Sequence, residues 1–187
     1  STASLQTTLN GEYYNGTYAT GALKNDSTRN AIESVVWNLG EVADDNSAIA
    51  SHFYGYERGT TVHSGRPTTW TGKVGLMYPS DYGYATSGGS TTDRSTCLSK
   101  ELYQWASVND CYNNDYLFND SYYQWTLTPL LSNIYYVLYV VTTGAVYRSS
   151  VDLDYNSVRP VAFLKSNILI KDGGSGTSES PYQLSLK

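Results

Sequence analysis

The sequence has little charge, and the charge that it has is mostly negative. Charged residues make up 16% of its 187 positions, and the formal net charge is −5. Binding to a phosphate backbone relies on clustered lysine and arginine, so this balance argues against nucleic acid as a partner. No apolar run approaches the roughly 20 residues that span a bilayer. The chain as given is therefore expected to be soluble.

Methionine and phenylalanine are scarce, with 1 and 3 residues, whereas tyrosine is abundant, with 19. Tyrosine combines a large apolar ring with a polar hydroxyl and has few torsions to order, so binding surfaces often contain it. A β core whose tyrosine hydroxyls reach the surface would have the same composition. Composition alone therefore leaves both interpretations open.

The sequence has only two cysteines, Cys97 and Cys111, and no Cys-x-x-Cys or His-x-x-x-His spacing that would indicate a metal site. We expect a local disulfide, and two buried free thiols are the alternative. Closing a loop of this size would stabilise the fold by about 3 kcal/mol if the gain is loop-closure entropy. A disulfide is typical of an oxidising compartment outside the cytosol.

Two short helices are predicted. The first spans residues 26–40, where Asp26 or Ser27 can cap the first turn and Gly40 can end the last one. Its buried face would be formed by Ile32, Val35, Val36 and Leu39. The second begins near Ser95 or Thr96 and carries three apolar side chains inward, namely Leu98, Leu102 and Tyr103.

Most of the remaining sequence predicts strands and turns, which together with the helices indicates an α+β fold. The predicted strands lie at 73–86, 123–129, 135–141, 144–149, 158–164 and 181–187. Segments rich in Gly, Ser and Asp connect them and are expected to be ordered loops. A chain of 187 residues can bury one good core but is short for two full-sized domains, so we expect a single domain over residues 1–187.

No cluster of titratable side chains indicates an active site. Three acidic pairs stand in polar sequence, where a solvated surface is the usual explanation: Asp44 with Asp45, Asp110 with Asp115, and Asp152 with Asp154. His52 and His63 lack the context of a catalytic motif such as G-x-S-x-G. Four charged residues stand among apolar neighbours and are expected to brace loops, namely Glu57, Arg58, Arg66 and Arg159.

The stretch at 130–155, LLSNIYYVLYVVTTGAVYRSSVDLDY, is rich in aromatic and aliphatic residues but keeps neither the period of a strand nor that of a helix. Alternate side chains would point outward as contact residues, with Gly144 turning the chain between two short strands. Val137, Tyr139 and Val146 would stay inside. The alternative is a continuous buried hairpin, whereas an exposed aromatic and aliphatic patch would indicate an interaction surface.

Longer motifs in the sequence resemble a known family. They are ERGTTVHSGRPTTWTGKVGLMYPSDYGYAT at 57–86, the paired cysteines, QWTLTP at 124–129, VRPVAFLKSNILI at 158–170 and GSGTSESPYQL at 174–184. From Tyr13 onward the chain resembles bacterial surface domains with a C-type-lectin-like fold, of the formylglycine-generating-enzyme-like branch. More narrowly, it is similar to the variable proteins of diversity-generating retroelements, some of which are joined to a prepilin-type N-terminal anchor. This resemblance implies contact with a membrane only through such an anchor outside this sequence, with residues 1–12 as the remnant of a linker to it.

The resemblance implies a C-type-lectin-like fold with two short helices, a small twisted antiparallel sheet and long ordered loops. It also implies a ligand-binding face of variable side chains near the C-terminal end. In such systems adenines are replaced during copying, so an Asn codon cannot become Lys, Glu, Gln, Met or Trp. These five types occupy 21 of the 187 positions, and about 3 would be expected by proportion in 130–155. None occurs there.

Two departures from the relatives limit what the resemblance implies. Cys97 and Cys111 flank a loop and match no catalytic motif of the formylglycine branch, so we expect no oxidase activity. The Glu-Pro-Asn and Gln-Pro-Asp triplets of calcium-dependent lectins are missing from the sequence, so we expect neither a metal nor another cofactor.

The sequence therefore predicts a non-enzymatic binding domain, a receptor or adhesin, displayed on a bacterial cell or on its phage particle. The alternatives are a pilin-type subunit that uses the same surface for self-assembly, and an enzyme with a cleft near His52 or His63. A protein ligand is expected rather than a glycan, because the face mixes tyrosine with aliphatic residues. The predicted face comprises Leu130, Leu131, Ile134, Tyr135, Tyr136, Leu138, Val141, Thr143, Ala145, Tyr147, Arg148, Ser149, Ser150, Asp152, Leu153, Asp154 and Tyr155.

Overall fold

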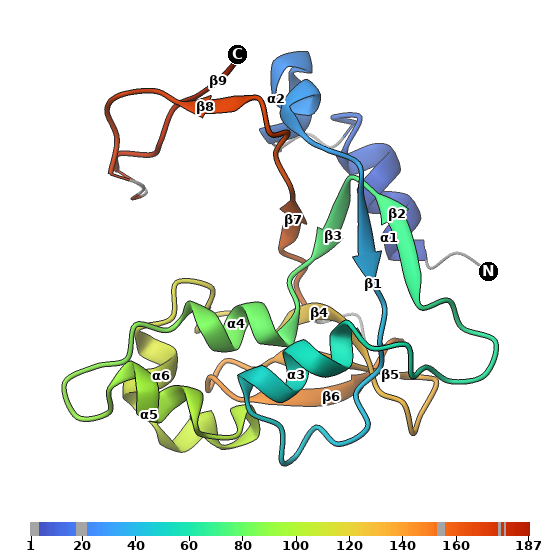
Figure 1. The fold of residues 1–187 in the computed structure, drawn as a ribbon, viewed down its shortest axis with the longest axis vertical. Helices are drawn as coiled ribbons and strands as arrows, with labels where there is room; N and C mark the ends of the chain where they lie inside the picture. The colour runs from blue at the N-terminus through green and yellow to red at the C-terminus, as the bar shows by residue number, and fades with distance from the viewer. Residues whose placement is uncertain (1–3, 18–21, 153–155, 176, 178) are drawn as a thin grey trace. The chain divides into compact units, whose positions relative to one another are not determined.

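The computed structural model describes residues 4–17, 22–152, 156–175, 177 and 179–187 (Figure 1). The chain divides into two compact units. The terminal unit comprises Ser1–Val35, Thr71–Gly75 and Ala162–Lys187, and the central unit comprises Val36–Trp70 and Leu76–Val161. The chain passes between the units four times, so both are assembled from separate segments, and the single domain over residues 1–187 stays a prediction.

Short helices and strands alternate along the chain, which confirms an α+β fold. The part of the chain that the structure describes has six α-helices where two were predicted: α1 (Ser4–Thr8), α2 (Asp26–Ala31), α3 (Ala50–Glu57), α4 (Pro79–Ala85), α5 (Arg94–Leu98) and α6 (Asn109–Asn113). Three further turns of helix are η1 (Leu9–Tyr13), η2 (Ala22–Lys24) and η3 (Leu102–Ser107). Among the described residues, none of these helices is both long and apolar enough to span a membrane.

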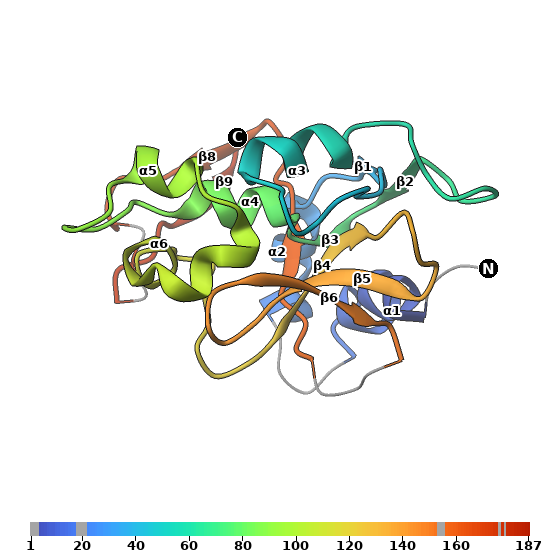
Figure 2. The ribbon, with the colours of Figure 1, turned by 90° about the horizontal axis from the view of Figure 1, so that it is seen from below.

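The strands form one three-stranded sheet and three smaller ladders. They are β1 (Val35–Asn38), β2 (Thr69–Gly72), β3 (Val74–Leu76), β4 (Gln124–Pro129), β5 (Tyr136–Val140), β6 (Val146–Ser150), β7 (Pro160–Ala162), β8 (Ile168–Ile170) and β9 (Leu184–Leu186). The three-stranded sheet is antiparallel in the order β4-β5-β6, and the pairs are β1-β2, β3-β7 and β8-β9. Within the central unit, α3 and α4 lie over this sheet, and α5 and α6 lie toward one end of it (Figures 1 and 2).

The core of the central unit lies between the sheet and these helices. Its buried side chains come from α3, α4, η3 and one face of the sheet, and include Phe53, Met77, Tyr82, Leu102, Trp105, Leu138, Val140 and Val146. Cys97 of α5 and Cys111 of α6 belong to this core and form the predicted disulfide, with their Cα atoms 5.4 Å apart. The disulfide therefore joins two short helices to each other beside the end of the sheet.

The helix predicted at 26–40 is wrong beyond Ala31. α2 ends there, and Val35–Asn38 form β1. The two valines of this segment are β-branched, which favours a strand over a helix. Alternation along the strand buries Trp37, which stacks on Trp70 with ring centroids 6.3 Å apart. Tertiary packing of these two indole rings thus outweighs an apolar pattern that also fits a helix.

The strand predicted at 73–86 is correct only for its first part, because α4 begins at Pro79. Proline suits the first position of a helix, and the Tyr78 N–H donates to the Asp81 carboxylate at 2.9 Å in a capping box. The sequence therefore contained a helix-start signal that the apolar pattern obscured.

The helix predicted near Ser95 is confirmed as α5, and its cap is Asp93, whose Oδ1 accepts the Thr96 N–H at 2.7 Å. Leu102 is buried as predicted. Tyr103 points outward instead, since a 3₁₀ turn places neighbouring side chains on different sides.

Candidate binding site

The predicted hairpin is present, and its turn lies where Gly144 was expected. The Gly144 N–H donates to the Val141 carbonyl and the Val141 N–H to the Ala145 carbonyl, both at 2.9 Å. Gly144 has a φ of +86°, which only glycine adopts readily. Its carbonyl accepts a hydrogen bond from the Tyr82 hydroxyl at 2.7 Å. A side chain at this position would overlap the Tyr112 ring, so the turn is packed tightly against α6.

The predicted alternation is confirmed only in part: Val146 of β6 is buried as predicted, but in β5 the opposite face points inward. Leu138 pairs with Arg148, and Val140 with Val146, so these cross-strand partners share one face. Leu138 and Val140 are fully buried in the core, whereas Val137 and Tyr139 are only half-buried. The predicted alternation of β5 is therefore wrong, because a one-residue change of phase exchanges the two faces.

The structure separates the predicted face into four groups. Five residues are buried and cannot contact a ligand, namely Leu130, Leu138, Val141, Ala145 and Ser149. Four are half-buried, namely Leu131, Tyr136, Tyr147 and Ser150. Five are exposed, namely Ile134, Tyr135, Thr143, Arg148 and Asp152. Leu153, Asp154 and Tyr155 lie outside the described residues.

Exposure is concentrated at the end of the hairpin away from Gly144, which we call the open end and define as residues 131–136 and 150–152. There Tyr135 is 63% exposed, Ile134 42% and Val151 53%. The Val151 N–H donates to the Tyr135 carbonyl at 2.8 Å, so these two residues are cross-strand neighbours. Val151 is exposed but was not part of the predicted face.

The open end is anchored by backbone hydrogen bonds to the preceding strand and to the 39–42 segment. The Leu130 N–H donates to the Tyr136 carbonyl at 3.0 Å, which closes the loop between β4 and β5. The Leu131 N–H donates to the Val42 carbonyl at 2.9 Å, and the Val42 N–H donates to the Pro129 carbonyl at 3.0 Å. Leu130 is buried at this junction, so the exposed side chains stand on an ordered support.

The rim of the hairpin has one fixed charge pair. Arg148 Nη1 lies 2.6 Å from Oδ1 of Asp45, and the Asp45 carboxylate is buried while the Arg148 side chain is partly exposed. Asp45 therefore has a structural role, whereas the sequence analysis assigned it to a solvated surface. Tyr147 packs edge-on against Tyr103 with ring centroids 4.8 Å apart, so one predicted contact residue already pairs with another aromatic ring of the same chain.

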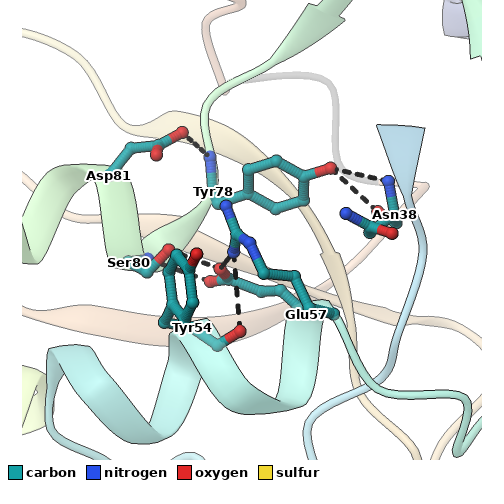
Figure 3. A network of polar contacts seen from close by, with 7 residues as sticks. Asn38, Tyr54, Glu57, Tyr78, Ser80 and Asp81 are labelled. Carbon is teal, nitrogen blue, oxygen red and sulfur yellow. Dashed lines mark hydrogen bonds and ion pairs between the residues drawn. The ribbon is translucent and has the colours of Figure 1, made fainter. Parts of the chain in front are cut away.

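The predicted structural braces are present. Glu57 is fully buried at the end of α3, where its carboxylate accepts the Ser80 N–H at 2.9 Å and the Ser80 hydroxyl (Figure 3). Arg58 Nη1 lies 3.1 Å from Glu57, and the guanidinium carbon lies 3.6 Å from the centroid of the Tyr54 ring. Burial raises the pKa of Glu57 to about 7, against the opposing effect of the Ser80 and Arg58 contacts.

The other two predicted braces are also paired. Arg66 Nη1 lies 2.6 Å from Oε1 of the buried Glu41, and Arg159 Nη1 donates to the Leu117 carbonyl at 2.7 Å. These contacts fix loops to the core of the central unit through charge-assisted hydrogen bonds.

The remaining titratable groups are dispersed. Asp110 accepts hydrogen bonds from Thr91 and Thr92, which lower its pKa. Asp115 is buried, and desolvation raises its pKa to about 7. His52 and His63 are both exposed. Within the described ranges, no group of three or more His, Cys, Asp or Glu side chains is placed to hold a metal ion.

Comparison with known proteins finds no match: no family model, no curated protein sequence and no solved structure is significantly similar to this chain.

Proposed function

We propose that this chain is a non-enzymatic ligand-binding domain, a receptor or adhesin, whose site is the open end of the β5-β6 hairpin. The observation that carries this proposal is the group of Ile134, Tyr135 and Val151, three large apolar residues that are exposed and are neighbours along the chain or across the strands of a packed hairpin. Apolar side chains that gather on a surface usually mark an interaction site, whereas isolated ones need no explanation.

The hairpin that carries these side chains is fixed at both ends, which favours a role in binding. The turn of the hairpin is fixed by Tyr82 and Tyr112, and the opposite end is fixed by the backbone bonds of Leu130 and Leu131. A site on an ordered element loses less conformational entropy when a ligand binds.

A protein is the proposed ligand rather than a glycan. The open end combines one exposed aromatic ring with aliphatic side chains, as hot spots between proteins do. Asp152 within the open end and Arg148 next to it are both exposed and would orient a partner more than they strengthen its binding.

A C-type-lectin-like fold of the retroelement-diversified type is part of the same proposal. The small antiparallel sheet, the ordered loops and the disulfide support it, together with the sequence motifs. The disulfide also supports display outside the cytosol, on a bacterial cell or a phage particle.

Binding experiments with a matched control test the proposal. The wild-type protein would be used to select binders from a phage-displayed random dodecapeptide library and to probe a glycan array. Tyr135→Ala should weaken the selected ligands by about tenfold or more, as truncation of an aromatic hot spot does. Tyr116→Ala is the control, because Tyr116 is 79% exposed but lies in another loop of the central unit. Unchanged binding by Tyr135→Ala, with an intact circular dichroism spectrum, would place the site elsewhere.

The predicted pilin-type subunit would assemble through the 130–155 surface. A subunit that assembles through the terminal unit instead is a second candidate, because another apolar group is exposed there. Leu169 and Ile170 of β8 and Leu184 of β9 are all exposed on a two-stranded ladder. A ladder of two strands is marginal on its own and gains stability from a packing partner. Sedimentation that shows concentration-dependent assembly, abolished by Ile170→Ser but not by Tyr135→Ala, would favour the subunit.

A further inference from the structure

We infer that the binding surface has a second wall, the loop at 60–67 between α3 and β2, which Arg66 holds against the open end. This inference rests on the proposed function and extends the site beyond the 130–155 stretch. Both parts belong to the central unit. The loop lies beside the connection between β4 and β5 in both views of the ribbon (Figures 1 and 2).

The buried residue Glu41 holds the loop at 60–67 in place. Its side chain is almost fully buried, and its two carboxylate oxygens bind different parts of the loop. Oε2 accepts the His63 N–H at 2.7 Å, and Oε1 lies 2.6 Å from Arg66 Nη1. The Glu41 N–H donates to the Thr61 carbonyl at 3.1 Å. One buried residue thus fixes the backbone or side chain of three loop positions.

Arg66 connects this loop to the candidate site. While its Nη1 binds Glu41, its Nη2 donates to the carbonyl of Ile134. The planar guanidinium can serve two acceptors in fixed directions, which a lysine ammonium does not reproduce. The backbone between Leu131 and Tyr135 is therefore positioned by a residue 68 positions earlier in the chain.

The side chains of the loop complement those of the open end. Thr60, Thr61, His63, Ser64 and Pro67 are exposed, and Val62 is half-buried. They carry hydroxyl and imidazole groups on a loop that Arg66 joins to the backbone of Ile134, and the only formal charge in the loop is Arg66, which already binds Glu41 and Ile134. The partner that fits is a protein segment with an apolar side chain for Ile134, Tyr135 and Val151, flanked by uncharged polar groups for the loop.

Arg66 is a positioning residue. The substitution Arg66→Lys should keep its contact with Glu41 and lose its contact with the Ile134 carbonyl. Lysine can still pair with Glu41, so the melting temperature should stay within about 2 °C of the wild type. It cannot also hold the Ile134 carbonyl, so peptides selected on the wild-type protein should bind about tenfold more weakly. The control is Arg94→Lys, because Arg94 also donates to two backbone carbonyls, those of Tyr84 and Thr86, in another part of the central unit.

His63→Ala tests the wall itself, because it removes an exposed side chain and keeps the backbone bond to Glu41. It should weaken the same peptides severalfold without changing the melting temperature. Combined with Tyr135→Ala, its effect should be non-additive if one ligand contacts both parts.

The outcomes distinguish this inference from the proposal beneath it. If Tyr135→Ala weakens binding while Arg66→Lys and His63→Ala bind like the wild type, the second wall is wrong and the open end remains the site. If Tyr135→Ala has no effect, the proposed function itself fails. Binding to the glycan array without any selected peptide, or to neither probe, would overturn the protein partner.

Discussion

Replacing Gly144 by alanine should destabilise the central unit strongly, for two reasons that can be separated. The left-handed backbone at φ +86° costs about 1 kcal/mol for a residue with a Cβ. The new methyl group would also overlap the Tyr112 ring, which packs against Phe118 with ring centroids 4.9 Å apart and cannot move freely. Overpacking of this kind costs about 2 kcal/mol. We therefore expect a loss of about 3 kcal/mol in the free energy of unfolding.

Gly65 provides a matched control. It has the same φ of +86°, but a Cβ built on it meets no atom within 4 Å. Gly65→Ala should therefore cost only the backbone contribution of about 1 kcal/mol. Urea unfolding followed by tryptophan fluorescence measures both variants in the right unit, because all four tryptophans, at positions 37, 70, 105 and 125, belong to the central unit.

A double-mutant cycle tests the cause of the larger effect. In a Tyr112→Gly background neither the ring nor the Cβ of Tyr112 meets the new methyl group, so Gly144→Ala should cost about as much as Gly65→Ala. Equal destabilisation by the two glycine substitutions in the wild-type background would refute the packing of the hairpin turn against α6.

Two further predictions concern pH and redox state. Burial raises the pKa of Glu57 to about 7, so the folded state binds more protons than the unfolded state between pH 4.5 and 7 and loses stability as the pH rises through this window. The melting temperature should therefore fall from pH 5 to pH 8, and the contribution of Glu57 to this loss of stability is on the order of 3 kcal/mol. The fall should be less steep in Glu57→Gln. A melting temperature that does not change with pH would contradict the burial of this carboxyl. Reduction of the Cys97–Cys111 disulfide should cost about 3 kcal/mol. Because both sulfurs are buried, the two thiols should become alkylated, as detected by mass spectrometry, only after reduction under denaturing conditions. Alkylation of the denatured, unreduced protein would show that the disulfide is not formed.

Local signals in the sequence determined several parts of the fold. The run QWTLTP predicted β4, and the Thr-Thr-Gly sequence between two apolar runs predicted the hairpin and its turn at Gly144. The spacing of Cys97 and Cys111 predicted their disulfide. In each case residues within about 15 positions of one another carry the physical cause, so no distant part of the chain was needed.

Tertiary structure decided the features for which the local pattern was ambiguous. An apolar sequence at 32–39 fits a helix face as well as a strand, and the pairing of Trp37 with Trp70 selected the strand. In β5 both faces carry apolar side chains, so the sequence could not show which of them would meet the helices. The inward orientation of Leu138 therefore could not be predicted, although the strand itself was predicted correctly.

The candidate site depends on both kinds of information. Its composition could be recognised in the sequence, because a stretch rich in tyrosine and aliphatic residues without a clear period is typical of a contact surface. Its boundaries could not, since exposure of Tyr135 and Val151 and burial of Leu130 follow from packing against segments far away in sequence. The same holds for Arg66, whose bond to Ile134 joins two loops that only the folded chain brings together.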